Sequence, residues 1–403
     1  MKILHTADWH IGKRLHKIDL SHDFDLFVNW LCKYLKEYPV DILLLSGDVF
    51  DFSNPSSESR NQYYRALIKL KTFHLKIIIT GGNHDSPSVL EAPKEILNQL
   101  DIHVIGQMPE TFENCLIPVP SDQNTELVIA AIPYLRSKNL QQQFSAESHE
   151  NKQAAVKESI AYHFQEAAKL AKKNYPHLPL IAMGHLFATG ASVSESERDI
   201  QIGNLAGLEA SHFGEDYNYI ALGHIHKPQR LQAETPIFYS GSPIPLSFSE
   251  RKNEKRILIL DTEKSYEPKS ITIPKFRDLV LIKGTLEEIK TKLASIENNL
   301  PLTTLIEVEL YEAEFSASKT YELEQLIESF NQPNCEVVKH KVTFKNKSEI
   351  ERGISSVESQ ISDFTPKEVF QKKLEGIDET EDTKLELMSA FEEILDELNR
   401  SEE

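Results

Sequence analysis

Residues 76–85, KIIITGGNHD, are an apolar β-branched run that ends in glycine, asparagine, histidine and aspartate. Four other segments have the same form: KILHTAD at 2–8, VDILLLSGD at 40–48, LIAMGH at 180–185 and YIALGH at 219–224. Helical segments lie between the early runs, at residues 23–37 and 58–70. This alternation predicts an α/β fold in which sheets are layered with helices. Polar residues just past strand ends are where such folds bind ligands.

The polar strand ends contain residue types that bind metals. In chain order the five motifs are Asp8-Trp9-His10, Gly47-Asp48, Gly82-Asn83-His84-Asp85, Gly184-His185 and Gly223-His224-Ile225-His226. Imidazole combined with carboxylate and amide oxygen suits divalent Mn, Fe, Zn or Co, whereas a pure oxygen cage would suit Mg or Ca. The three cysteines form no CxxC pair, so no thiolate zinc site is indicated.

The spacing within the motifs predicts that they converge. Residues two apart on a strand point to the same side, so Asp8 with His10, and His224 with His226, can reach one pocket if strand geometry continues past the strand end. The glycines before Asp48, Asn83, His185 and His224 are expected to let the backbone turn sharply and approach an ion. A lone Gly-His pair is usually a cap or a core histidine. Five such motifs in order indicate a metal site.

Composition restricts the class of protein. The 403-residue chain has a net charge of −18, which alone argues against nucleic acid, because duplex binding usually needs a basic face. Residues 351–403 carry sixteen Asp or Glu against six Lys or Arg, so much of the excess negative charge lies in this C-terminal tail. The rest of the chain is less acidic and stays compatible with DNA binding. No apolar run approaches the length of a membrane span and no signal peptide is evident. We therefore expect a soluble, cytoplasmic protein with no membrane association.

The second half of the chain predicts smaller modules. Residues 238–248, FYSGSPIPLSF, and 255–261, KRILILD, indicate a strand-rich stretch. We predict domains at 1–272 (catalytic) and 273–346 (a strand–helix–strand–helix–strand α+β cap), a linker at 347–364, and C-terminal helices at 365–403. In these helices Leu385, Met388, Phe391, Leu395 and Leu398 form one apolar stripe, which either docks on this chain or binds a partner.

The motifs resemble those of the calcineurin-like metallophosphoesterase family, whose fold is a β-sandwich flanked by helices. Longer strings resemble its SbcD branch, the bacterial nuclease subunits: TADWHIGK, SGDVFD followed by NPSS, GGNHDSP, GHLF, ALGHIHKPQ and YSGSPIPLSF. The resemblance covers roughly residues 1–345. The five motifs identify the superfamily, and the longer strings, the cap and the helical tail indicate the branch.

The resemblance implies two metals that share Asp48. One would be held by Asp8, His10, Asp48 and His226, and the other by Asp48, Asn83, His185 and His224. His84 matches the family's catalytic histidine, which is not a ligand, and Asp85 matches the residue that orients it. Asp51, which closes GDVFD, stands where some members outside the bacterial branch carry histidine, and its role stays open.

The activity that the resemblance implies is DNA cleavage with manganese, or iron as the alternative. It would act as an exonuclease on double strands and as an endonuclease on single strands and hairpins, in recombination, repair and replication. Water held between two cations would lose a proton and attack phosphorus, with His84 assisting. The implied partners are DNA, a second copy of the chain through residues 58–70 and 89–100, and an SbcC-type coiled-coil ATPase on the C-terminal helices, in a heterotetramer.

Two other functions fit part of the pattern. A phosphomonoesterase or cyclic-nucleotide phosphodiesterase of the same superfamily could share all five motifs, although it would not need the cap and the acidic tail. A non-catalytic scaffold on this fold would have lost His84 or several ligands, and this sequence keeps them all.

Overall fold

The computed structural model describes residues 1–141, 149–192, 197, 207–312, 317–344, 387, 388 and 391. The chain divides into two compact units. The first comprises residues 1–282, 292–308 and 330–340, and the second comprises 283–291, 309–329 and 341–403. The predicted linker at 347–364 and nearly all of the predicted helices at 365–403 lie outside the described residues.

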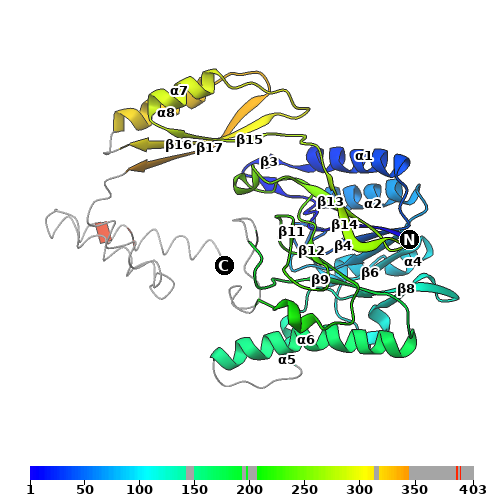
Figure 1. The fold of residues 1–403 in the computed structure, drawn as a ribbon. Helices are drawn as coiled ribbons and strands as arrows, with labels where there is room; N and C mark the ends of the chain where they lie inside the picture. The colour runs from blue at the N-terminus through cyan, green and yellow to red at the C-terminus, as the bar shows by residue number, and fades with distance from the viewer. Residues whose placement is uncertain are drawn as a thin grey trace. The chain divides into compact units, whose positions relative to one another are not determined.

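Two six-stranded sheets form most of the first unit (Figure 1). The first has the order β14 (Ser265–Thr272), β13 (Arg256–Asp261), β1 (Lys2–Thr6), β4 (Ile42–Ser46), β5 (Lys76–Thr80), β6 (Ile102–Ile105). The second has the order β11 (Gln229–Arg230), β12 (Ile237–Tyr239), β10 (Tyr219–Gly223), β9 (Leu180–His185), β8 (Asn124–Ala131), β7 (Leu116–Ser121). Strands β1, β4, β5 and β6 are parallel, as are β8, β9, β10 and β12. The carboxyl ends of the central strands therefore lie at one edge of each sheet.

The sheets pack face to face, and helices cover their outer faces. Side chains from both sheets, among them Ile3, Leu44, Ile129 and Met183, form one buried cluster. Helices α1 (Ser21–Glu37) and α2 (Ser57–Lys71) pack on the first sheet, and α6 (His149–Asn174) packs on the second. Burial on both faces explains why strands such as ILLLS in β4 are continuously apolar. The predicted α/β sandwich flanked by helices is confirmed.

Short elements complete the first unit. They are β2 (Arg14–Leu15), β3 (Ile18–Asp19), α3 (Pro87–Glu91), α4 (Lys94–Gln99), η1 (Phe112–Cys115), α5 (Ser137–Gln141), η2 (Ala210–Phe213) and η3 (Phe248–Glu250). The predicted strand-rich stretch is confirmed at its two ends, by β12 at Ile237–Tyr239 and by β13 at Arg256–Asp261, whereas the segment between them contains no strand. Gly241, with φ +75°, and the two prolines that follow it cannot continue a ladder.

A third sheet has the order β15 (Leu279–Gly284), β16 (Thr304–Glu312), β17 (Cys335–Phe344). Helices α7 (Leu286–Ala294) and α8 (Ala317–Glu328) alternate with these strands, as the sequence predicted. Within the second unit Ile289, Leu310 and Leu323 are fully buried.

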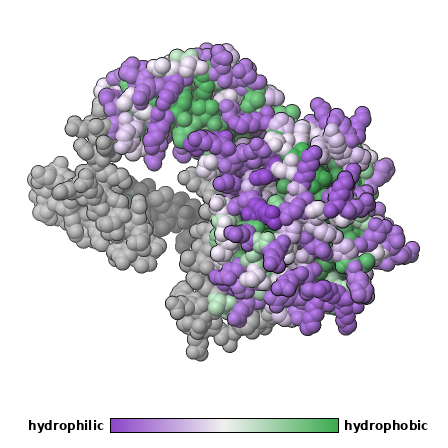
Figure 2. All heavy atoms as spheres, viewed as in Figure 1, coloured by the Kyte–Doolittle hydropathy of each residue, from purple (hydrophilic) through white to green (hydrophobic). Residues whose placement is uncertain are grey.

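Figure 2 shows hydrophilic residues over most of the face in view, with apolar residues in small patches. Among the described helices, none combines the length and the apolar character that crossing a membrane requires.

Candidate metal centre

The predicted ligands gather where the central strands of both sheets end. They follow β1, β4 and β5 on the first sheet and β9 and β10 on the second. Asn83 is half-buried. All the other predicted site residues are buried, namely Asp8, His10, Asp48, His84, Asp85, His185, His224 and His226.

The backbone that presents these residues is not a continuing strand, so the expectation that strand geometry brings them together was wrong. Strand β1 ends at Thr6, and β10 ends at Gly223. Four ligand-type residues beyond the strand ends instead have left-handed backbone, with φ of 54° at Asp8, 44° at His10, 49° at Asp48 and 98° at His224. Such strain, about 1–3 kcal/mol per residue, concentrates at functional sites.

Two loops hold this backbone in place. The amide of Asp8 donates to the carbonyl of Gly47 at 3.1 Å, and that of His10 donates to the carbonyl of Asp48 at 3.0 Å. Gly47 does turn the backbone sharply, with φ +81°. Two of the other glycines instead allow neighbouring loops to lie close together. A Cβ on Gly223 would lie 1.8 Å from the carbonyl oxygen of Ser46, and one on Gly82 would lie 2.1 Å from Asp48 Oδ1.

Asp48 lies between two clusters of ligand atoms. Its Oδ1 accepts a hydrogen bond from the His84 amide at 2.9 Å, and its Oδ2 lies 3.3 Å from His185 Nε2 and 3.5 Å from His10 Nε2. Asn83 Oδ1 lies 2.9 Å from the same His185 nitrogen.

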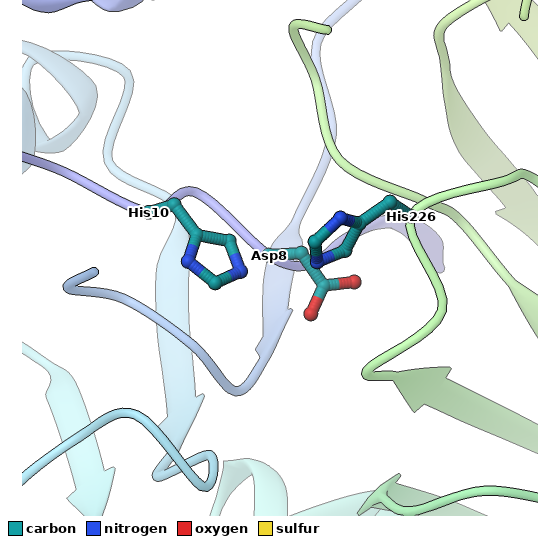
Figure 3. A group of neighbouring side chains, drawn as sticks. All are labelled: Asp8, His10 and His226. Atoms are coloured by element: carbon teal, nitrogen blue, oxygen red, sulfur yellow. The ribbon is translucent and has the colours of Figure 1, made fainter. Parts of the chain in front are cut away.

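Donor atoms within 4.8 Å of one another define three overlapping groups, each able to hold an ion: Asp8, His10 and His226 (Figure 3); Asp48, His185 and His224; and His10, Asp48 and His84. The structure thus brings the two predicted ligand sets together around Asp48.

Hydrogen bonds on the outer nitrogen fix the tautomer of four histidines. His10 Nδ1 lies 3.1 Å from Asp51 Oδ1, and His226 Nδ1 lies 3.3 Å from Glu250 Oε1. His185 Nδ1 lies 3.0 Å from the carbonyl of Ser46, and His84 Nδ1 lies 2.8 Å from the carbonyl of Asp51. Because these oxygens accept, each Nδ1 donates, and the lone pair is on Nε2 in the neutral ring. That is the arrangement of a metal-binding imidazole.

Several buried atoms of the centre make no hydrogen bond. Among the described residues, Asp8 Oδ2, His10 Nε2 and His224 Nε2 are buried and accept or donate no hydrogen bond. Buried polar atoms are costly unless they are satisfied, and a divalent cation would satisfy these three together. The residues present therefore fit divalent metal binding.

The charges of the centre agree with this. Burial raises the pKa of Asp8 to about 7. Burial opposes the charged form of His185, but the carboxylates of Asp48 and Asp8 outweigh it and raise the pKa of His185 to about 9. The carboxylates thus attract positive charge to this position, and a divalent cation that binds there displaces the His185 proton.

Asp85 and Asp51 brace the loops of the centre. The Asp85 carboxylate accepts from the amides of Val49, Phe50 and Gly82 at 2.9–3.0 Å, so it ties the β4 loop to the β5 loop that carries His84. Asp51, whose role the sequence left open, accepts from His10 Nδ1 and from Lys13 Nζ at 3.2 Å.

Sequence reasoning missed two further residues that support the ligands. Glu250 contacts His226 from 24 positions away, and no local pattern marks it. The Arg136 guanidinium donates to the carbonyl of Asp85. A single arginine outside any motif gives no signal.

Comparisons with known proteins agree with this geometry. The family model for calcineurin-like phosphoesterase matches residues 1–228. Three relatives are named as the SbcD component of the nuclease SbcCD. The protein from Escherichia coli (strain K12) is 29% identical over 96% of each chain. The protein from Rhodobacter capsulatus is 35% identical over 68% of this chain and 70% of its own. The protein from Bacillus subtilis (strain 168) is 32% identical over 66% of this chain and 68% of its own.

Proposed function

This chain belongs to the calcineurin-like phosphoesterase family and, within it, to the SbcD nuclease subunits, and from its metal centre we propose that it cleaves DNA with two manganese ions. The observation that carries the proposal is the Asp48 carboxylate, which faces histidines of both clusters.

Two ligand sets follow from the clusters. Asp8, His10, Asp48 and His226 hold one ion in this proposal, and Asp48, Asn83, His185 and His224 hold the other. The nitrogen and oxygen donors suit Mn²⁺, with Fe²⁺ as the alternative. When bound, such a pair activates water and offsets the negative charge of a phosphodiester.

Of the remaining residues, His84 transfers a proton and Asp85 positions His84. The Nδ1 of His84 donates to the carbonyl of Asp51, which leaves Nε2 as the atom that exchanges a proton with the leaving oxygen. Asp85 acts on His84 through the loop, because its carboxylate accepts from the amide of Val49, which follows Asp48, and from the amide of Gly82, two residues before His84.

The partners follow from family membership. The chain acts with an SbcC-type coiled-coil ATPase, which binds residues 365–403, and the predicted cap at 273–346 selects DNA ends or strands. A second copy docks on α2 and α4, where Ile68 is 65% and Ile96 is 71% exposed. These parts form a heterotetramer that processes DNA ends and hairpins in the cytoplasm, during recombination, repair and replication.

A panel of substrates tests the proposal. The full chain is given Mn²⁺ with labelled hairpin and linear duplexes, single strands, a phosphomonoester and a cyclic nucleotide. We expect metal-dependent cleavage of DNA, by exonuclease action on duplex ends and endonuclease action on hairpins. Hydrolysis of the small esters without DNA cleavage would instead support the phosphomonoesterase or cyclic-nucleotide alternative. No hydrolysis, even with the ATPase partner and ATP, would support the scaffold.

A further inference from the structure

The two ligand clusters differ in what lies behind their histidines. In the cluster of Asp8, His10 and His226, both imidazoles donate from Nδ1 to a carboxylate, Asp51 for His10 and Glu250 for His226. Both carboxylates are buried, Asp51 at 3% and Glu250 at 0% exposure. Each is therefore shielded from water, which strengthens its effect on the imidazole.

The other cluster has weaker support. His185 donates from Nδ1 to a main-chain carbonyl, that of Ser46. Across the described part of the chain, no carboxylate accepts a hydrogen bond from Nδ1 of His185 or His224. Asn83, the additional ligand proposed here, is uncharged, whereas the first cluster has the carboxylate of Asp8 as well as the shared Asp48.

Glu250 is itself held from several directions. Its Oε2 accepts from Lys255 Nζ, from Ser242 Oγ at 3.3 Å and from the Leu246 amide at 3.3 Å. Lys255 also donates to the carbonyl of His226 at 3.1 Å, and the Ser242 amide donates to the same carbonyl at 3.2 Å. Residues 242–255 therefore fix both the ring and the backbone of His226, which gives the SGSPIPLSF segment a role.

A carboxylate behind a metal-binding imidazole orients the ring and raises its basicity, and its loss typically lowers metal affinity by about 10–100-fold. We propose that Glu250 and Asp51 are positioning residues that make the ion position at Asp8, His10 and His226 the tighter of the two. The position at Asn83, His185 and His224 then fills only at higher metal concentration. This rests on the metal centre of the proposed function, but not on its substrate.

The test measures Mn²⁺ binding to the full chain by equilibrium dialysis and calorimetry, with the electron paramagnetic resonance spectrum as a second readout. The wild type should bind one ion tightly and a second more weakly, and one equivalent of Mn²⁺ should give the spectrum of an isolated ion. Glu250→Gln should weaken the tight step by about 10–100-fold and leave the weak step unchanged. Asn83→Ala should remove the weak step and keep the tight one.

The matched control is Glu312→Gln. Glu312 is also buried and ion-paired, with Lys319 at 2.7 Å, and it belongs to the second unit, whereas the ligand residues belong to the first. It should leave both binding steps unchanged. Asp51→Asn provides a second variant that does not disturb Lys255, and it should also weaken the tight step.

Two Mn²⁺-binding steps of equal affinity in the wild type would overturn the proposal. So would a Glu250→Gln variant that loses the weak binding step and keeps the tight one. Equal effects of Glu250→Gln and Glu312→Gln would mean that Glu250 acts only on folding. Failure of the wild type to cut DNA would count against the proposed function and would not alter these binding steps.

Discussion

The buried imidazole of His5 should make the sandwich sensitive to acid. His5 is fully buried between the sheets, where its Nδ1 lies 2.9 Å from the hydroxyl of Tyr219. Burial lowers the pKa of His5 from 6.5 to about 3. Between these two values the unfolded chain binds a proton that the folded chain excludes, so stability is complete above pH 6.5 and falls as the pH drops toward 3. From pH 7 to pH 5 the loss due to His5 alone is about 2 kcal/mol.

Urea unfolding in the presence of EDTA measures this loss. Trp9 and Trp30 are the only tryptophans in the sequence, and both lie in the first unit, so fluorescence follows its unfolding. His5→Gln cannot gain the proton, and its free energy of unfolding should fall by about 2 kcal/mol less than that of the wild type between pH 7 and pH 5. The control, His22→Gln on the exposed face of α1, should show the wild-type dependence. Equal pH dependence of the wild type and His5→Gln would refute the reasoning.

Three other perturbations test the metal centre and its partners. Lys255→Met leaves the Glu250 carboxylate buried without its cation and should lower the free energy of unfolding in urea by about 3–5 kcal/mol. The double variant Glu250→Met/Lys255→Met should be less destabilised than Lys255→Met. A double variant that is more destabilised would contradict the pairing of these two residues. His84→Ala should retain its bound Mn²⁺ but lose at least ~10²-fold in DNA cleavage, whereas loss of metal would make His84 a ligand. Deletion of residues 365–403 should abolish binding to an SbcC-type ATPase in a pull-down and leave weak Mn²⁺-dependent cleavage. Undiminished binding would exclude this segment as the docking site.

The sequence pattern was sufficient for an α/β fold with helices layered on its sheets and for the gathering of ligand-type residues, and the family resemblance supplied the sandwich. Strands buried on both faces are continuously apolar, and the ligand residues follow directly at their ends, so both features appear as local patterns. Strand periodicity nevertheless gave the wrong backbone. The left-handed φ of Asp8, His10, Asp48 and His224 depends on hydrogen bonds between loops that are far apart in the sequence.

The residues that support the ligands could not be predicted for a related reason. Glu250 and Arg136 act through contacts to segments tens of residues away, and neither lies in a motif with recognisable spacing. The role of Asp51 became visible only when the fold placed its carboxylate behind His10 and its carbonyl behind His84. Strand patterns also could not show that the chain leaves the sheet after Tyr239, where the Ser242 amide donates to the carbonyl of His226.

The most direct test of the shared-carboxylate centre compares Asp48→Ala with Asp41→Ala. Asp48 follows strand β4 and faces both ligand clusters, whereas Asp41 precedes the same strand and its exposed carboxylate accepts from the Lys2 amide. Bound Mn²⁺ and cleavage of a labelled hairpin duplex are measured for both variants and the wild type. We predict that Asp48→Ala loses cleavage and weakens the binding of both ions, while Asp41→Ala keeps both properties. Mn²⁺-dependent cleavage by Asp48→Ala at the wild-type rate would contradict a centre built on this shared carboxylate.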